Sequence, residues 1–371
     1  MGWGQAWGAA LALTVVLGAL APTGGWAAEV LVIAHRGSSG ERPEHTLAAY
    51  ARAIDQGADF IEPDIVATKD GVLVARHENE ISGTTDVASR PEFAARKATK
   101  IIDGEPVTGW FTEDFTLAEL KTLRARERLP DLRPGSAAFD GQEPVPTLAE
   151  VIDLVRRKGA EAGRRVGLYP ELKHPTYFQS IGLPLEGRLV EALHAAGLEG
   201  PGAPVFIQSF EVGSLRALRG MTGLRLVQLI AATGAPADWA AAGEPGTYAD
   251  MLTGPGLARV RAYADGVGLE KALLVPRGPG GEALAPTGLA AKAKAAGLLV
   301  HAWTFRSENA FLPAGLRRGE PADPAHKALH GDWAAEYRQF RDLGVHGVFS
   351  DFPAHAVAAL RPGAGQGAAG R

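Results

Sequence analysis

Short apolar runs alternate along the chain with longer Ala- and Leu-rich segments that carry polar residues on one face. The runs predict strands at residues 30–34, 59–66, 166–172, 204–209, 224–230, 265–269, 298–304 and 345–349. The segments between them have the spacing of amphipathic helices. Alternating strands and helices are typical of βαβ units in a parallel sheet. Eight strands of this kind predict an α/β fold, a closed (β/α)8 TIM barrel, although an open doubly wound sheet shares the same alternation.

The tetrapeptide Thr-Leu-Ala-Glu occurs at residues 116–119 and again at residues 147–150. It fits the capping box, in which a Thr and a Glu three residues later satisfy the free N–H groups of a helix start. We therefore predict that helices begin directly after Thr116 and Thr147.

One connection is too long for a single barrel unit. About 90 residues separate His77 from the strand at residue 166, where one helix and two loops would suffice. We therefore expect an insertion after the second strand, at about residues 80–145, and a smaller one at about residues 306–330. Loops of this length are usually covers of a functional site or disordered.

The first 27 residues are apolar, end in small residues and contain no Lys or Arg. Their apolar core, Ala9 to Leu20, is about half as long as a membrane-spanning helix. This pattern is typical of a secretory signal peptide, with cleavage after Ala27, and a short membrane anchor is the alternative. We expect a domain at residues 28–361, in the periplasm or secreted, and a disordered tail at residues 362–371.

Composition narrows the class of partner. The formal net charge is −4 without a long basic run, so nothing favours nucleic acid or an anionic membrane surface. The chain has no Cys, which excludes disulfides and thiol catalysis. We expect a monomer or homodimer that binds a small molecule and has no stable membrane insertion once the signal is cleaved.

Seven charged or titratable side chains stand at or near the carboxyl ends of predicted strands. The set is His35, Arg36, Glu62, Asp64, His77, Glu171 and Lys173. Glu62 and Asp64 are two residues apart, as are Glu171 and Lys173, so each pair shares a face of its strand. The carboxyl ends of the strands form the catalytic face of a barrel. Because a buried unpaired charge costs several kcal/mol, we expect these groups to meet each other, a metal or water there.

The residue types indicate one kind of chemistry. Three carboxylates, Glu62, Asp64 and Glu171, offer hard oxygen ligands that favour one Ca²⁺ or Mg²⁺ over zinc. His35 and His77 can exchange protons near neutral pH as general base and general acid. A metal beside an arginine and paired imidazoles indicates phosphoryl transfer. A single such residue is more often structural, but seven at one end of the strands favour an active site.

Several longer motifs, in this order, carry a family resemblance: AHRG, PEHT, GADFIEPDI, His77-Glu-Asn, PELK, IQSF, AWTFR and SDFP. With these the chain closely resembles the glycerophosphodiester phosphodiesterase family, in particular its periplasmic bacterial branch. The resemblance implies a barrel with an insertion after the second strand and a Ca²⁺ or Mg²⁺ site. It also implies hydrolysis of substrates such as glycerophosphocholine and glycerophosphoethanolamine to sn-glycerol 3-phosphate and an alcohol.

The resemblance also implies a role for each matched residue. The acid and base fall on His35 and His77, and the metal carboxylates on Glu62, Asp64 and Glu171. Substrate-binding positions fall on Arg36 and Lys173 at the phosphate and on Phe210, Trp303 and Phe305 at the apolar side of the glycerol pocket.

Some positions depart from the common family pattern. Many relatives have Asn where His45 stands and Asp where Glu78 follows the second histidine. We expect neither residue to touch the groups that contact metal or substrate. Glu44 is expected behind those groups, and Asp351 is expected to be a loop cap or a contact at the rim.

Two other functions remain possible from the sequence. A barrel phosphodiesterase that acts on intact phospholipid would need an exposed apolar or basic rim, for which the insertion offers Trp110, Phe111 and Phe115. The acidic Glu113 and Asp114 between them argue against membrane entry. A non-enzymatic surface binding protein would have no need of paired imidazoles.

Overall fold

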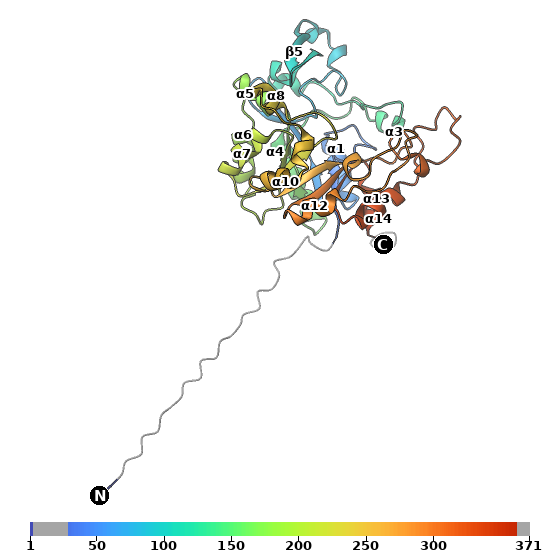
Figure 1. Cartoon of the computed structure of the whole chain (residues 1–371). Coiled ribbons are helices and arrows are strands. Elements are labelled where there is room, and N and C mark those ends of the chain that lie inside the picture. The colour runs from blue at the N-terminus through green and yellow to red at the C-terminus, as the bar shows by residue number, and fades with distance from the viewer. Residues whose placement is uncertain (3–28, 362–371) are drawn as a thin grey trace.

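The computed structural model describes residues 1–2 and 29–361, and Figure 1 shows the whole chain. The predicted tail, and all but the first two residues of the predicted signal peptide, lie outside the described residues. In the part that is described, no helix is long and apolar enough to cross a membrane.

All eight predicted strands are present and close into a barrel. Its wall consists of β1 (Leu31–His35), β2 (Phe60–Glu62) with β3 (Asp64–Ala67), β7 (Gly167–Leu168) with β8 (Glu171–Leu172), β9 (Phe206–Ser209), β10 (Arg225–Ile230), β11 (Gly266–Glu270), β12 (Leu299–Phe305) and β13 (Gly347–Ser350). Neighbouring wall strands pair in parallel, and β13 returns to β1 with Gly347 opposite Leu31. The prediction of a (β/α)8 barrel is confirmed.

Two wall strands are interrupted where the sequence has proline. Pro63 separates β2 from β3, and Pro170 lies between β7 and β8. Proline has no N–H to donate to the ladder. Both carbonyls still accept from the next strand, at 3.0 Å from Glu171 N to Pro63 O and 2.9 Å from Gln208 N to Pro170 O. The wall is therefore continuous around these breaks.

Helices surround the barrel in the order that alternation predicted (Figure 1). They are α1 (Leu47–Asp55), α4 (Leu148–Glu161), α5 (Pro175–Ser180), α6 (Glu186–Ala195), α7 (Val212–Met221), α8 (Ala237–Ala242), α9 (Tyr248–Met251), α10 (Gly254–Arg261), α11 (Lys271–Leu274), α12 (Leu289–Ala295), α13 (Trp333–Asp342) and α14 (Pro353–Leu360). Thr147 caps α4 with the predicted capping box, and Thr116 does the same for α2 (Leu117–Leu120).

Alternate residues of the wall strands point inward and fill the barrel. The inner core consists of Leu31, Ile33, Phe60, Tyr169, Phe206, Val227 and Phe349. Two residues further along four of these strands, the inward positions are polar: His35, Glu62, Glu171 and Gln208. Inward positions recur every two residues along a strand, so the apolar layer inside the barrel is followed by a polar layer at the carboxyl ends of the strands.

The predicted insertion lies between β4 (Leu73–Ala75) and α4. It contains η1 (Val87–Ser89), η2 (Pro91–Arg96), the antiparallel pair β5 (Ala98–Ile102) and β6 (Glu105–Gly109), η3 (Thr112–Asp114), α2 and α3 (Pro134–Ala137). Phe93, Trp110 and Phe115 form its small core, and the Trp110 indole N–H donates to Phe93 O at 2.7 Å. In Figure 1 the β5 strand projects to one side of the barrel and α3 to another. The second predicted insertion, residues 306–330, is mostly loop around η4 (Ala314–Leu316).

Candidate active site

A cavity of about 120 Å³ opens at the carboxyl ends of the wall strands. Six of the seven side chains that the sequence placed at strand ends line it: His35, Arg36, Glu62, His77, Glu171 and Lys173. Asp64 lies directly behind, 3.6 Å from the Lys173 ammonium and completely buried. The structure therefore brings all seven together.

The three carboxylates Glu62, Asp64 and Glu171 form one buried group. Each offers an oxygen atom, and these atoms lie within 4.8 Å of one another. The backbone N–H of Arg36 and the side-chain amide of Gln208 donate to Glu62, at 2.8 Å and 3.0 Å. Asp64 Oδ1 accepts no hydrogen bond and has the Lys173 ammonium 3.6 Å away, so this oxygen still has room for a closer contact with a cation.

Crowding changes the acidity of the three carboxyl groups in different directions. Burial, together with the charges of the other two, raises the pKa of Glu62 well above its usual range. Burial also raises the pKa of Glu171 to about 8 against the opposing charge of Lys173. Burial acts the same way on Asp64, but the charge of Lys173 and the hydrogen bond from His45 hold its pKa well below the usual range. A divalent ion among the three would relieve the repulsion that raises two of these values.

The first histidine is fixed by a partner from the other end of the chain. His35 Nδ1 lies 2.6 Å from Asp351 Oδ1. Because an ionised carboxylate only accepts hydrogen bonds, Nδ1 carries the hydrogen and Nε2 faces the cavity with a free lone pair. Burial lowers the pKa of His35 to about 4. Asp351 stays ionised because Arg133 and Arg306 outweigh burial and hold its pKa well below its usual range.

The second histidine has the same arrangement but reaches the site differently. β4 pairs antiparallel to β3, with Ala75 opposite Ile65, so the chain turns back and brings His77 to the cavity. The sequence analysis instead placed His77 at the end of a strand of the common polarity, and this detail was wrong. His77 Nδ1 donates to Glu78 Oε1, and burial lowers the pKa of His77 to about 3.

The two cations lie on either side of the carboxylates. Lys173 Nζ lies 2.6 Å from Glu171 Oε1, and the guanidinium of Arg36 lies 3.1 Å from Glu44. Arg36 Nε makes no hydrogen bond but lies 3.7 Å from Asp64 Oδ2. Arg36 has a φ of 60° and is followed by Gly37 at 89°, where a Cβ would lie 2.8 Å from Ala49. This tight turn directs the Arg36 backbone N–H at Glu62.

Of the three aromatic residues predicted at the substrate pocket, two line the cavity and one does not. Phe210 and Trp303 both line the cavity, with ring centroids 5.7 Å apart and nearly perpendicular planes. Phe305 does not line it, so its assignment to the substrate pocket was wrong. Its ring is fully buried and stacks on Tyr337 of α13 at 4.8 Å. The register of β12 shifts between Ala302 and Phe305, so Trp303 and Phe305, two residues apart, do not share a face of the strand.

Several residues around the site contact its central groups although they were not predicted to do so. His45 Nε2 lies 2.8 Å from Asp64 Oδ2, and Glu78 is the partner of His77, so both departures from the family pattern touch the central groups. Asp351 holds His35 rather than capping a loop. Glu44 lies behind Arg36, as expected. Gln208, within the quoted IQSF motif, lines the cavity and was not selected; its position two residues after an inward Phe206 was the available signal.

A family model, the glycerophosphoryl diester phosphodiesterase family, matches residues 35–355. Glycerophosphodiester phosphodiesterase GDPD6 of Arabidopsis thaliana is 37% identical over 333 residues, which cover 86% of this chain and 83% of the relative. A glycerophosphodiester phosphodiesterase of Haemophilus influenzae is 33% identical over 262 residues, with coverages of 64% and 68%. The plant relative shares more identity than this bacterial one, so the matches support the family and leave the branch open.

Solved structures support the fold. A glycerophosphoryl diester phosphodiesterase described as putative, from Silicibacter pomeroyi, superposes with a TM-score of 0.60 at 21% identity, covering 90% of this chain and 94% of the other. A phosphodiesterase of Oleispira antarctica, solved in complex with the product sn-glycerol-3-phosphate, gives 0.56 at 22% identity, covering 89% and 96%. With the family match over the barrel and its site, the chain belongs to the glycerophosphoryl diester phosphodiesterase family and is, by homology, a glycerophosphodiester phosphodiesterase.

Proposed function

We propose that this protein hydrolyses small glycerophosphodiesters, such as glycerophosphocholine and glycerophosphoethanolamine, to sn-glycerol 3-phosphate and an alcohol. One observation carries the proposal: two imidazoles, each held at Nδ1 by a carboxylate, face one cavity that is also lined by two cations and by Glu62 and Glu171, with Asp64 directly behind. The product bound to the related Oleispira antarctica enzyme is consistent with it.

Arg36 and Lys173 bind the phosphate in this proposal. Both are charged and line the cavity, so their positive charge reaches a phosphate bound there. A guanidinium suits this task because its fork can contact two oxygens of one phosphate. Phe210 and Trp303 pack against the carbon atoms of the glycerol.

His35 and His77 move the protons. One Nε2 accepts the proton of the glycerol 2-hydroxyl as its oxygen bonds to phosphorus. The other imidazole, in its protonated form, gives a proton to the departing alcohol oxygen as the phosphorus–oxygen bond breaks. Water then opens the cyclic phosphate with the two roles exchanged, which restores both imidazoles. Proximity to the anionic diester favours the protonated form that the acid requires.

Glu62, Asp64 and Glu171 would hold one divalent ion, Ca²⁺ or Mg²⁺. The fit rests on three buried carboxylates within 4.8 Å and on the unpartnered Oδ1 of Asp64. Oxygen ligands of this kind favour hard cations. When bound, such an ion supplies positive charge to the phosphate oxygens.

Intact phospholipid is disfavoured as the substrate. Trp110, Phe111 and Phe115, the aromatic residues that could have formed an apolar rim, are all buried inside the insertion. The cavity of about 120 Å³ suits a glycerophosphate group better than a diacylglycerol. A non-enzymatic role is disfavoured by the two histidine–carboxylate pairs, which a binding protein does not need.

The proposed place of action is the periplasm or the exterior of a bacterial cell. The apolar segment at residues 1–27 supports export, and the motif resemblance supports the periplasmic branch of the family.

The test is an assay of purified mature protein with glycerophosphocholine, with Ca²⁺ or Mg²⁺ and with a chelator. We expect glycerol 3-phosphate and choline in equal amounts, and loss of both with the chelator. No glycerol 3-phosphate with either metal would disprove the proposal. Release of a phosphorylated headgroup from phosphatidylcholine vesicles instead would favour the phospholipase alternative.

A further inference from the structure

We propose that two arginines of the insertion, Arg128 and Arg133, are positioning residues that hold the carboxylate partners of the two cavity histidines. This inference rests on the proposed function for the role of His35 and His77 in proton transfer. It assigns the insertion a part in the active site, where a loop of this kind is ordinarily expected to be a cover.

Arg128 holds the partner of His77. Its guanidinium donates to both carboxylate oxygens of Glu78, at 3.0 Å and 2.6 Å, and Glu78 Oε1 accepts from His77 Nδ1. The other edge of the same guanidinium binds both oxygens of Glu44, at 2.9 Å and 2.7 Å. Glu44 in turn pairs with Arg36, so one arginine fixes Glu78 and Glu44 relative to each other.

Arg133 holds the partner of His35. Its guanidinium donates to Asp351 Oδ2 at 2.6 Å, and Asp351 Oδ1 accepts from His35. Two further contacts fix its direction: Glu308 Oε1 at 2.7 Å and the backbone carbonyl of Ser39 at 3.1 Å. Arg133 is 7% exposed, and its partners come from the loops that follow β1, β12 and β13. It therefore ties three barrel loops to the insertion.

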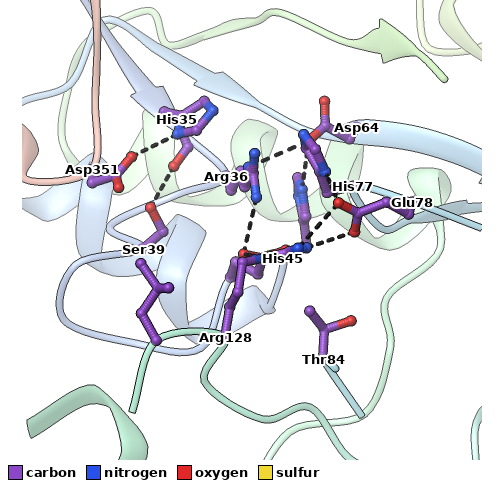
Figure 2. Close-up of polar contacts among 12 residues, drawn as sticks. His35, Arg36, Ser39, His45, Asp64, His77, Glu78, Thr84, Arg128 and Asp351 are labelled. Atoms are coloured by element: carbon purple, nitrogen blue, oxygen red, sulfur yellow. Dashed lines mark hydrogen bonds and ion pairs between the residues drawn. The ribbon is translucent and has the colours of Figure 1, made fainter. Parts of the chain in front are cut away.

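The two arginines belong to one short, internally braced segment. Arg133 lies five positions after Arg128, and its backbone N–H donates to the carbonyl of Leu129 at 2.9 Å. Glu127 accepts from Leu129 N at 2.8 Å and from the Ser136 hydroxyl at 2.5 Å, which closes the segment on both sides. Figure 2 shows the result: Arg128 lies against Glu78 on the side of His77, while Asp351 lies against His35 on the opposite side.

Both arginines act by fixing the orientation of a carboxylate. An aspartate or glutamate that accepts from Nδ1 fixes the ring and its tautomer only while its own side chain is held. A guanidinium can do this because its coplanar donors reach several acceptors at fixed angles, whereas an ammonium acts as a point charge. Arg128 contacts both oxygens of Glu78, and Arg133 contacts one oxygen of Asp351. Without Arg128, Glu78 gains rotational freedom, and without Arg133, Asp351 is held only by Arg306 Nε at 3.0 Å. In each case the imidazole that depends on the carboxylate is held less firmly in its direction toward the cavity.

Arg128 provides the sharper test because its side chain is partly exposed, so its removal is less disruptive to folding. We expect Arg128→Ala to lower kcat for glycerophosphocholine about 10- to 100-fold, with a smaller change in KM, since the Arg36–Glu44 pair remains. Arg126→Ala is the matched control. It lies two residues away, is more than half exposed, and its guanidinium comes no closer than 3.6 Å to Asp140. The control should keep wild-type kcat, and an equal loss in both variants would overturn the proposal.

A double-mutant cycle separates positioning from general stabilisation. If Arg128 acts through Glu78, Arg128→Ala should cost less than about twofold in kcat when Glu78 is already Ala. A full and additive loss in that background would show that Arg128 does not act through Glu78, and the proposal would fail. For the buried Arg133, Arg133→Lys keeps the charge and removes the fork. We expect the same 10- to 100-fold fall in kcat at an unchanged circular dichroism spectrum, and wild-type kcat in this folded variant would contradict the role.

A readout without substrate keeps the inference separate from the proposed function. In protein labelled with ¹⁵N-histidine, the ring signals of His77, assigned by their loss in His77→Gln, should show hydrogen on Nδ1 alone. Arg128→Ala should convert them to a mixture of tautomers, while Arg126→Ala should not. Unchanged His77 signals in Arg128→Ala would overturn the inference, even if wild-type protein proved inactive on every glycerophosphodiester.

Discussion

His45 and Asp64 form a hydrogen bond of 2.8 Å inside the protein, from Nε2 to Oδ2, with both side chains fully buried. Tyr50 contacts the other ring nitrogen of His45 at 2.7 Å. Because the Asp64 carboxylate only accepts, Nε2 carries the hydrogen and Tyr50 donates its own to Nδ1. The orientation of a proposed metal carboxylate therefore depends on an imidazole where many relatives have an amide.

We predict that His45→Asn keeps metal affinity within a few-fold, since an amide N–H can replace Nε2–H as the donor to Asp64. His45→Leu leaves Oδ2 without that donor and should weaken Ca²⁺ or Mg²⁺ binding about 10- to 100-fold. Isothermal titration calorimetry on both variants measures the difference. Equal affinities for the Asn and Leu variants would show that the contact does not support the metal site.

The two cavity histidines should be separately indispensable for turnover. His35→Ala and His77→Ala should each lower kcat by about two to four orders of magnitude, because each removes one proton-transfer group. His194→Ala, on the outer helix α6, is the control and should keep wild-type activity. If either cavity variant turns over glycerophosphocholine like the control, that histidine has no part in proton transfer.

Metal should stabilise the fold measurably. Binding at about 100 times the dissociation constant raises the free energy of unfolding by about 2.7 kcal/mol, which denaturant titration with and without Ca²⁺ or Mg²⁺ can detect. Glu62→Gln should lose this gain. In chelator, however, the same variant should be at least as stable as wild type, since it removes one of three carboxylates crowded within 4.8 Å. A lower stability of the metal-free variant would contradict the proposed repulsion.

A buried histidine inside the barrel should make the free energy of unfolding depend on pH. His301 is fully buried with Nδ1 2.6 Å from the Tyr169 hydroxyl, and burial lowers its pKa to about 3. The unfolded chain binds a proton at this position below its ordinary pKa of about 6.5, whereas the folded chain does not until about pH 3. Stability is therefore lost as the pH falls below 6.5, by about 2 kcal/mol from this residue between pH 7 and pH 5.

His301→Gln should flatten that dependence. We expect the free energy of unfolding of the variant, from urea titrations at pH 7 and pH 5, to change by about 2 kcal/mol less than that of wild type. A variant with the same slope as wild type would assign the acid sensitivity to other groups.

The barrel could be predicted because the sequence pattern of its strands and helices is local and repeats along the chain. Alternation of apolar runs with amphipathic segments identified all eight wall strands, and the same-face rule brought Glu62 and Glu171 into one layer. The capping boxes identified the starts of α2 and α4 because both groups of each box lie within four residues.

What the sequence could not predict depends on contacts between distant segments or on a local irregularity. The antiparallel return of β4 was indicated only by the Asp70-Gly71 turn, which the strand prediction did not use, so the direction of approach of His77 was missed. A register shift in β12, which a motif match cannot reveal, takes Phe305 away from the cavity. Arg128 and Arg133 lie in a stretch without periodicity, and nothing near them in sequence indicates that their partners are Glu78 and Asp351.

The contact between His35 and Asp351 joins residues 316 positions apart, across the seam where the first and last wall strands meet. During synthesis His35 leaves the ribosome early and Asp351 very late. A nascent chain, or one cut short before the last strand, therefore has no partner for the first imidazole, however well its earlier strands have formed. Turnover should begin only when translation has passed residue 351, so activity reports the finished chain.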